Sequence, residues 1–396
     1  MRQRAPDNVF RMDPTVYSRA STSKKTPWLQ ALIQSHWTKT ILIAVVVTGV
    51  LLVALLNLEH TAVHPAEGQF KHPGPKYELI AGAEVVWEKP SNPKGVLFVA
   101  HGCNHGAVDF WHSSRDCPSC TGLPEEMNIT RAALSRGYAV VAISSQDRTD
   151  SRCWSLPGME SDMGDIDVVQ KALQRLLKRE RLANLPLYAF GASSGGGFVL
   201  ALAAVFPFDA ICSQIMGLPA PFMAVLLTDE TLLEYPPTLL VHMPRDTHTH
   251  KLVKETMMAV HKSGVKVAEI QVPPQPMTPT TLSDIIPTTD LSSDQSAKIF
   301  EALSAAGLLD AAGMLTQDPR QTQWRKVLKD ADVPGFTSLR LKSDLSPISE
   351  VLNRLYAQHE ITSATTTDML DWFESPSVGY VKDGSEAAAE VASEAA

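Results

Sequence analysis

The stretch Leu187–Phe198, LYAFGASSGGGF, decides the fold of this chain. An apolar run leads into Gly-x-Ser-x-Gly, and a second apolar segment with helical character follows. This order predicts a buried strand, a sharp turn with Ser193 at its apex, and a helix. In this predicted geometry the Ser193 hydroxyl stands clear of the strand, and the Ser194 backbone N–H points toward the same space. The alternative is a Gly/Ser-rich turn that has no catalytic role. The rest of the sequence is needed to distinguish these two interpretations.

Short apolar runs alternate with amphipathic segments on both sides of this turn. The expected strands lie at 96–100, 138–144, 187–190, 210–216, 238–243 and 265–272, and the expected helices at 123–136, 162–182, 196–205 and between the last two strands. Uniformly apolar strands that alternate with helices indicate a parallel sheet covered on both faces. We therefore expect an α/β fold, with a doubly wound, mostly parallel sheet over roughly residues 77–376.

Residues 275–350 break this rhythm. They are first rich in Pro, Thr, Ser and Asp and then helical around 296–307 and 324–330. So long an insertion is more typical of a functional helical cap than of a structureless loop. A last helix is expected at 361–373, and the Ala/Glu-rich residues 377–396 are expected to be disordered.

Composition excludes some classes of protein. The 396 residues are 44% hydrophobic and 20% charged, as in a globular protein with ample core. The net charge of -8 and the lack of a basic stripe in the large C-terminal part argue against a nucleic-acid partner.

Residues 40–58 carry no charge and are long enough to cross a bilayer as one helix. Residues 1–39 contain an excess of Lys and Arg, whereas acidic residues follow the apolar run. This asymmetry predicts a type II signal anchor with a flexible cytosolic N-terminus, a stalk at 59–76, and a domain in the lumen of the secretory pathway or outside the cell. A cleaved signal peptide fits less well, because the apolar run is longer than an h-region.

The five cysteines agree with that location. Four lie among polar neighbours, and they are Cys103, Cys117, Cys120 and Cys153, whereas Cys212 lies in an apolar run. Four cysteines in an oxidising lumen predict two disulfides, whose pairing the sequence leaves open. A zinc site that combines these cysteines with His105 and His112 is a less favoured alternative.

The sequon Asn128-Ile129-Thr130 is usable on the lumenal side alone. We therefore expect a glycan on Asn128.

Two residues can complete a catalytic group with Ser193. Asp246 follows the strand at 238–243 and so lies at the carboxyl edge of the sheet, although it could also serve as a helix N-cap. His359 lies just before the expected terminal helix, and an imidazole can accept the proton of a serine near neutral pH. The competing histidines lie beside the acid in the sequence: His242, His248 and His250.

With these residues in the order Ser, acid, His, the chain resembles the α/β-hydrolase superfamily, in particular its esterases and lipases. The resemblance implies that Ser193 is the nucleophile, Asp246 the acid and His359 the base. Val99-Ala100-His101-Gly102 resembles the His-Gly motif of the family. It implies an oxyanion hole made by the backbone N–H groups of Ser194 and Cys103, with Gly102 as the alternative to Cys103 because the chain departs from His-Gly-Gly-Gly.

A closer likeness is to membrane-anchored hydrolase-like proteins of plants and algae. It rests on His-Gly-Cys, Cys-Pro-Ser-Cys, Gly-Ala-Ser-Ser-Gly-Gly and His-Met-Pro-Arg-Asp.

The sequence therefore predicts a membrane-anchored serine hydrolase that cleaves an ester, or less readily an amide, of a small-molecule or lipid-like acyl substrate. We expect no metal and no cofactor in its site. The rival hypothesis is a catalytically silent α/β-hydrolase fold that serves as a tethered binding protein.

Overall fold

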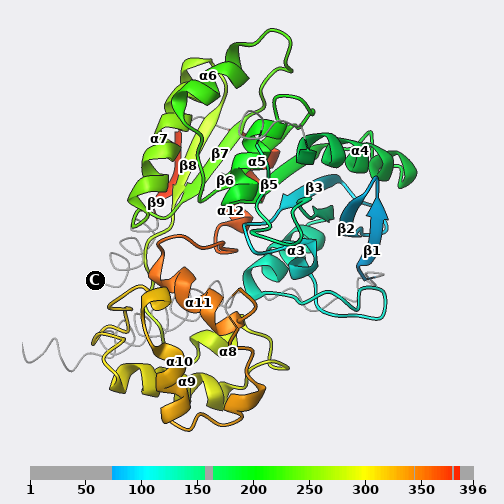
Figure 1. The fold of residues 1–396 in the computed structure, drawn as a ribbon. Helices are drawn as coiled ribbons and strands as arrows, with labels where there is room; N and C mark the ends of the chain where they lie inside the picture. The colour runs from blue at the N-terminus through cyan, green and yellow to red at the C-terminus, as the bar shows by residue number, and fades with distance from the viewer. Residues whose placement is uncertain (1–73, 157–163, 343, 377–378, 384–396) are drawn as a thin grey trace, which may run out of the picture. The chain divides into compact units, whose positions relative to one another are not determined.

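The computed structural model describes residues 74–156, 164–342, 344–376 and 379–383 (Figure 1). The expected N-terminal segment, the membrane segment 40–58, most of the stalk and the tail from 384 onward lie outside these residues. Among the described helices, none combines the length and the apolar character that crossing a bilayer requires.

Nine strands form one sheet. Their order is β1 (Lys76–Ile80), β2 (Ala83–Glu88), β4 (Tyr138–Ile143), β3 (Gly95–Ala100), β5 (Leu187–Ala192), β6 (Ala210–Gln214), β7 (Thr238–His242), β8 (Val267–Gln271) and β9 (Gly379–Asp383). The pairs β1–β2 and β2–β4 are antiparallel, and all other pairs are parallel. The sheet is therefore mostly parallel, and the order β4–β3–β5 is the reversal expected of a doubly wound fold.

Side chains of the central strands alternate between two apolar clusters. In β3, Val96 and Phe98 belong to one cluster, and Leu97 and Val99 belong to the other. Successive side chains of a strand point to opposite faces, so a strand that is apolar throughout needs cover on both sides. The first cluster includes residues of α4 (Gly164–Arg179), α5 (Ser194–Leu202), α6 (Ala220–Thr228) and α7 (Thr247–Lys262), and the second includes residues of α3 (Pro124–Ser135) and α12 (Thr366–Glu374).

A helical unit with its own apolar cluster follows β8. It contains α8 (Thr281–Ile285), α9 (Ser293–Ala305), η2 (Pro319–Gln321), α10 (Trp324–Asp330), η3 (Phe336–Ser338) and α11 (Pro347–Tyr356). Its contacts with the sheet domain include packing of α11 against α3 and hydrogen bonds from Arg340 to the carbonyls of Thr121 and Gly122. The unit therefore packs on the sheet domain beside α3 and the loop that precedes α3 (Figure 1).

The C-terminal part differs from the expectation in three places. Disorder was expected from residue 377, but residues Gly379–Asp383 form β9, because this segment adds to the open edge of β8 as a parallel strand. The helix α11 was not predicted, although Ser346 caps it by accepting from the Ser349 N–H and Pro347 stands at its first position. The last helix begins at Thr366 rather than at 361. The side chain of Gln214 accepts from the N–H and donates to the carbonyl of Thr362, which holds this segment outside the helix.

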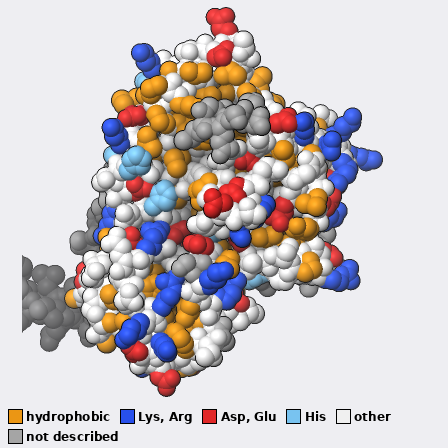
Figure 2. All heavy atoms as spheres, viewed as in Figure 1, with side chains coloured by type: hydrophobic (Ala, Val, Ile, Leu, Met, Phe, Trp, Pro, Cys, Tyr) orange, Lys and Arg blue, Asp and Glu red, His pale blue; other side chains and the backbone are white. Residues whose placement is uncertain are grey.

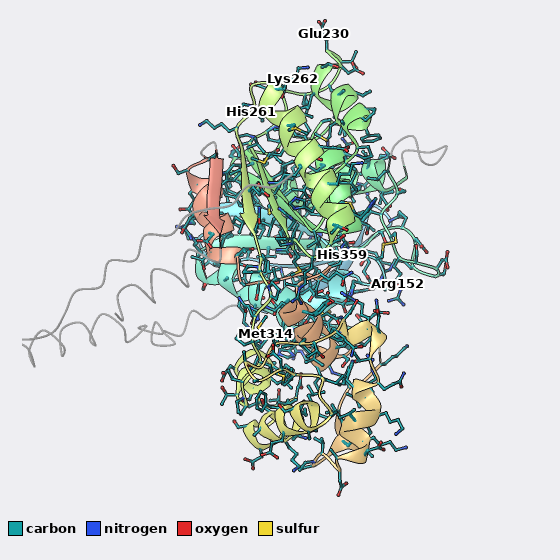
Figure 3. The ribbon with its side chains drawn as sticks, turned by 90° about the vertical axis from the view of Figure 1, so that its left-hand side faces the viewer. Arg152, Glu230, His261, Lys262, Met314 and His359 are labelled. Carbon is teal, nitrogen blue, oxygen red and sulfur yellow. A yellow bond between two sulfur atoms is a disulfide. The ribbon has the colours of Figure 1, made fainter. Side chains whose placement is uncertain are left out.

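Apolar side chains gather on the surface over α6 and α7 (Figure 2). Val225 on α6 is 58% exposed and Met258 on α7 is 64% exposed, and Met258 borders a groove between the two helices. His261 and Lys262 mark this end of α7, far from His359 (Figure 3). The apolar groove is therefore remote from the predicted catalytic residues.

Candidate active site

Ser193 occupies a turn that most residues avoid. It follows β5, precedes α5, and has φ 52° and ψ -121°. A Cβ on Gly191 would overlap the Gly195 carbonyl, and one on Gly195 would overlap the carbonyl of Ala100. The two glycines are therefore required for the strand, the turn and the helix to meet this closely.

Backbone hydrogen bonds fix the turn on both sides. The Ser193 N–H donates to the Gln214 carbonyl at 2.9 Å, and the Ser193 carbonyl accepts from Gly196 and Gly197 at 2.9 and 3.1 Å. The nucleophile candidate is thus held by the neighbouring strand β6 and by the first turn of α5.

The structure brings Ser193, His359 and Asp246 into one chain of hydrogen bonds. The Ser193 Oγ lies 2.9 Å from His359 Nε2, and His359 Nδ1 lies 2.5 Å from Asp246 Oδ2. Both distances are in the range needed for proton transfer and for orientation of the ring. The side chain of Asp246 is 14% exposed and that of His359 is 37% exposed, so solvent and a small substrate can reach the imidazole.

Asp246 has both of the roles considered for it. Its Oδ1 accepts from the Thr249 N–H at 3.0 Å and caps α7, while its Oδ2 meets His359. Burial acts to raise the pKa of Asp246, but the hydrogen bonds from Thr249 and His359 outweigh burial and lower it. The carboxylate is therefore ionised at neutral pH and can stabilise an imidazolium.

Two of the competing histidines near Asp246 belong to a different cluster. His242 is buried, and its Nε2 lies 2.6 Å from Oε1 of Glu269, which also binds Lys254 Nζ at 2.7 Å. The His250 ring packs on the His242 ring with centroids 4.9 Å apart. These histidines are held away from Ser193 by contacts of their own.

The predicted oxyanion donors lie beside Ser193. Ser194 is the first residue of α5, so its N–H has no acceptor within the helix. A Cβ on Gly102 would lie 3.6 Å from the Ser193 Cβ, and Cys103 lines the same cavity as Ser193. The Ser194 and Cys103 amides are therefore near the position where a carbonyl carbon would be attacked.

His101, in the His-Gly motif, is a structural residue. Its Nδ1 lies 2.6 Å from the Gly102 carbonyl oxygen, and its Nε2 accepts from the Ser145 N–H at 3.0 Å. Burial lowers the pKa of His101 to about 3, so the ring is neutral. This side chain ties the loop after β3 to the end of β4.

The four polar-region cysteines form two disulfides, Cys103–Cys153 and Cys117–Cys120. Cys212 is a free and buried thiol, and burial raises its pKa well above the usual value. The disulfides use the sulfur atoms that the zinc alternative required, and among the described residues no three His, Cys, Asp or Glu side chains are grouped as metal ligands. The pairing resolves the choice that the sequence left open.

A cavity of about 310 Å³ opens at Ser193 and His359. Its lining includes residues of the sheet domain and, from the helical unit and the loop after α11, Arg320, Asp344, Asn353 and Glu360. His359 lies where the two parts of the described chain meet (Figure 3). The sequence reasoning missed these four residues, since the sole local signal was the proximity of Glu360 to His359.

Arg320 links the helical unit to the catalytic loop. Its guanidinium donates to the His359 carbonyl and to Glu360 Oε2, the latter at 3.2 Å. The same Glu360 oxygen accepts from Asn353 Nδ2 at 2.9 Å. The position of His359 thus depends on side chains from η2 and α11.

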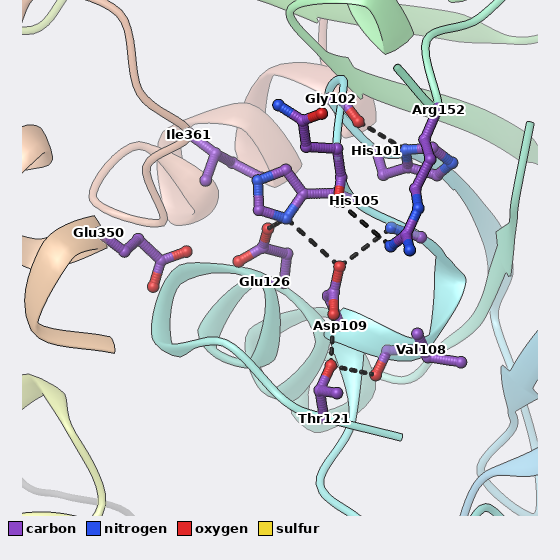
Figure 4. Close-up of polar contacts among 12 residues, drawn as sticks. His101, Gly102, His105, Val108, Asp109, Thr121, Glu126, Arg152, Glu350 and Ile361 are labelled. Carbon is purple, nitrogen blue, oxygen red and sulfur yellow. Dashed lines mark hydrogen bonds and ion pairs between the residues drawn. The ribbon is translucent and has the colours of Figure 1, made fainter. Parts of the chain in front are cut away.

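A buried acid–base cluster borders the cavity (Figure 4). His105 Nδ1 lies 3.3 Å from Asp109 Oδ2 and 3.9 Å from Glu126 Oε1. Burial opposes a charge on His105, but the hydrogen bond to Asp109 and the nearby carboxylates outweigh it and raise the pKa to about 9. His105 is therefore an imidazolium at neutral pH.

Glu126 and Glu350 share a hydrogen bond in this cluster. Burial raises the pKa of Glu126 to about 7, and burial together with the Glu126 charge raises the pKa of Glu350 well above its usual value. One proton between the two carboxyl groups accounts for the two oxygens, Glu126 Oε2 and Glu350 Oε1, that have no other partner. Both shifts favour the protonated forms, so the pair beside His105 retains a proton up to near neutral pH.

The glycosylation sequon lies within α3. The Asn128 Oδ1 accepts from Arg131 at 3.2 Å, and Thr130 is buried. Glycosylation of Asn128 stays a prediction.

No family model matches the chain, and no curated protein matches its sequence. Solved structures similar in part include a dienelactone hydrolase from Anabaena variabilis, with a TM-score of 0.36, 17% identity, and coverage of 51% of this chain and 87% of that chain. They also include an esterase/lipase from an uncultured bacterium, with a TM-score of 0.35, 12% identity, and coverage of 59% and 84%. An esterase from Pyrococcus furiosus has a TM-score of 0.35, 14% identity, and coverage of 52% and 84%.

The strand order, the covered parallel sheet and the turn at Ser193 are those of the α/β-hydrolase fold, as the sequence predicted.

Proposed function

We propose that this protein is a serine hydrolase that cleaves carboxylic esters through an acyl-enzyme. The observation that supports this most directly is the continuous hydrogen-bond chain from Ser193 through His359 to Asp246 at the mouth of a cavity. Three side chains from distant parts of the sequence meet in the geometry that nucleophilic catalysis needs.

In the first half of the reaction, His359 Nε2 takes the hydroxyl proton as the Ser193 Oγ attacks the acyl carbon. The carbonyl oxygen becomes an oxyanion near the Ser194 and Cys103 amides. When the tetrahedral intermediate collapses, the bond to the alcohol oxygen breaks and His359 gives its proton to that oxygen. The products of this half are a free alcohol and an ester on Ser193.

In the second half, water attacks the acyl-enzyme and loses a proton to His359. Collapse of the second tetrahedral intermediate breaks the bond to the Ser193 Oγ, which recovers the proton. A carboxylic acid leaves and the enzyme is restored. Each oxyanion donor contributes about 3 kcal/mol to such a reaction, and Asp246 keeps the ring in the tautomer with its proton on Nδ1.

The rival hypothesis is a silent fold that binds without catalysis. Such a protein has no need of a strained serine, or of an ionised Asp246 and a solvent-accessible His359 in hydrogen-bond contact. These features favour an enzyme, and an ester is the easier substrate because its alcohol is a better leaving group than an amine.

We also propose that residues 40–58 anchor the enzyme as a type II membrane protein, with the hydrolase domain in the lumen of the secretory pathway or outside the cell. The charge asymmetry around this segment supports the orientation, and two disulfides suit an oxidising compartment. A C-terminal tag should resist protease in sealed microsomes and be digested after detergent is added. Digestion without detergent would contradict the orientation.

Labelling with a fluorophosphonate tests the catalytic proposal. The solubilised full-length protein should be labelled on Ser193, whereas Ser193→Ala should give no label and should lose roughly 10⁴-fold or more of its turnover of a small activated ester. The exposed-site variant His261→Ala is the control and should behave as wild type. An unlabelled wild-type protein would favour the silent fold.

A further inference from the structure

One buried acceptor at the cavity has no partner. Asn353, on α11, is 7% exposed and lines the cavity that contains Ser193. Its Nδ2 donates to Glu360, but its Oδ1 makes no hydrogen bond with the described residues. A buried oxygen without a donor costs free energy, so this atom calls for a donor from a bound molecule or a water.

Space for such a donor lies next to Asn353. A void of about 40 Å³ is lined by polar residues that include His105, Ser346, Asn353 and Glu360. This volume is enough for one water or one hydroxyl group, with several polar partners around it. Both this void and the main cavity touch Asn353, so a substrate hydroxyl can enter from the side of Ser193.

The direction of the reaction places the alcohol of the ester on this side. His359 gives its proton to the leaving alcohol, so that alcohol lies toward His359 rather than toward the oxyanion donors. Glu360 follows His359 directly, and Asn353 contacts Glu360 at 2.9 Å. The alcohol part of the substrate therefore meets Asn353 and Glu360.

The chemistry of this wall favours neutral hydroxyl groups. The positive charges of His105 and Arg320 already face the carboxylates of Asp109, Glu126 and Glu360. Asp344, the remaining carboxylate of the lining, is exposed to solvent, so the wall does not require a cationic ligand. Long apolar chains would bury these charged groups without partners, which is unfavourable. Hydroxyl groups can donate to Asn353 and Glu360 and accept from Arg320.

We propose that Asn353 and Glu360 form a subsite for the hydroxyl groups of the alcohol part, and that the substrates are esters of small polyols or sugars. The cavity of about 310 Å³ is at the lower end of the size of ligand sites, which agrees with a small polar alcohol. This inference rests on the proposed esterase function.

Two acetate esters of matched size test the subsite. Glycerol 1-monoacetate and propyl acetate share the acyl group and the three-carbon alcohol, and they differ in two hydroxyl groups. We expect kcat/KM of the full-length enzyme to be about tenfold or more higher for glycerol 1-monoacetate than for propyl acetate. One good hydrogen bond to a buried acceptor gives a factor of this size. A wild-type ratio of one or less overturns the subsite, whatever the variants do.

The variant Asn353→Leu keeps the branched heavy-atom skeleton of the side chain and removes its acceptor. The ratio of the two kcat/KM values should fall to about one, mainly through a higher KM for the monoacetate. Asn184→Leu, in an exposed loop, is the matched control and should keep the wild-type ratio. An unchanged ratio in Asn353→Leu overturns the assignment of Asn353, and Asn353→Ser replaces it if the leucine variant does not fold.

The outcomes separate the two proposals. If Ser193 is required for hydrolysis of propyl acetate but the monoacetate is not preferred, the subsite is wrong and the esterase function stands. If neither ester is hydrolysed, both proposals are wrong.

Discussion

The two walls of the cavity are built in different ways. On the sheet side, Ser193 and the oxyanion donors depend on backbone geometry, with glycines at close approaches and N–H groups at the start of a helix. On the helical side, Arg320, Asn353 and Glu360 depend on hydrogen bonds between long side chains. The sheet wall holds the proposed nucleophile, and the helical wall holds His359 and contributes the polar groups of the proposed subsite.

The two walls respond differently to substitution. A backbone-built wall tolerates few residues at its key positions, because a single Cβ at Gly191 or Gly195 overlaps the chain. A side-chain-built wall can change one group at a time. We therefore expect the sheet side to determine the reaction and the helical side to tune its rate and its substrates.

After Ser193→Ala, the largest effect is expected at Asp246, whose contact with His359 joins the two walls. Asp246→Asn should lower turnover of a small ester by about 10³- to 10⁴-fold, because the amide no longer holds His359 in the productive tautomer. Asparagine is as good an N-cap as aspartate, so α7 and the melting temperature should be preserved. Loss of folding, seen by circular dichroism, would show that capping is the main role of Asp246.

A smaller effect is expected from the helical wall. Arg320→Met should lower kcat for propyl acetate by roughly 10- to 100-fold, since the His359 carbonyl and Glu360 lose their donor and small displacements of a catalytic group have large costs. Arg115→Met, at a fully exposed site, is the control. A wild-type kcat in Arg320→Met would mean that the helical wall does not position His359.

The disulfides compare two loops of very different length. Cys103–Cys153 closes a separation of 50 residues and Cys117–Cys120 one of 3. Chain entropy assigns about 4 kcal/mol of unfolding free energy to the first and about 2 kcal/mol to the second. Cys103→Ala with Cys153→Ala should therefore lower the midpoint of urea unfolding more than the matched pair at Cys117 and Cys120, and equal shifts would contradict this account.

The smallest effect is a pH dependence of stability. The folded pKa values of Glu126, about 7, and of His105, about 9, are raised above their unfolded values of 4.5 and 6.5. Both contributions are complete below the unfolded pKa values and are lost as pH rises through the folded ones. Between pH 5 and pH 6.5 the buried neutral His101, whose folded pKa is about 3, gains stability as pH rises and offsets the loss from Glu126. The free energy of unfolding should therefore decrease by about 1 kcal/mol or more between pH 6.5 and pH 9, and the melting temperature should fall with it.

Glu126→Gln distinguishes the two groups. The amide cannot ionise, so the variant lacks the loss of stability that ionisation of Glu126 causes between pH 4.5 and 7. The change in melting temperature over this interval should therefore be more positive in the variant than in the wild type, and the same change in both proteins would show that other groups are responsible.

The sheet wall could be predicted from the sequence because its signals are local. Gly-x-Ser-x-Gly after an apolar run predicts the turn at Ser193, and an aspartate directly after a strand predicts Asp246 at the carboxyl edge. Four cysteines predicted two disulfides. Their pairing depends on how close the loops after β3 and β4 lie in space, and the spacing of the cysteines along the chain does not show this.

The helical wall could not be predicted in the same way. Asn353 lies on α11, whose apolar face packs against the other helices of the helical unit. Its contact with Glu360 depends on the turn that follows α11. Glu126 and Glu350 are more than two hundred residues apart and meet because α3 packs on α11. Buried like-charged pairs of this kind have no signature in periodicity or composition.

The central place of β5 has a consequence for how the site opens in time. This strand pairs with β3 and β6, and both of its faces are covered, so its amide hydrogens should exchange only when the domain unfolds globally. His359 lies on a loop that is not part of the sheet, and side chains from η2 and α11 hold this loop in place. Local opening of this loop needs less free energy, and each opening removes the imidazole from a serine that stays in place. The lifetime of the assembled triad is therefore set by the histidine loop and not by the nucleophile.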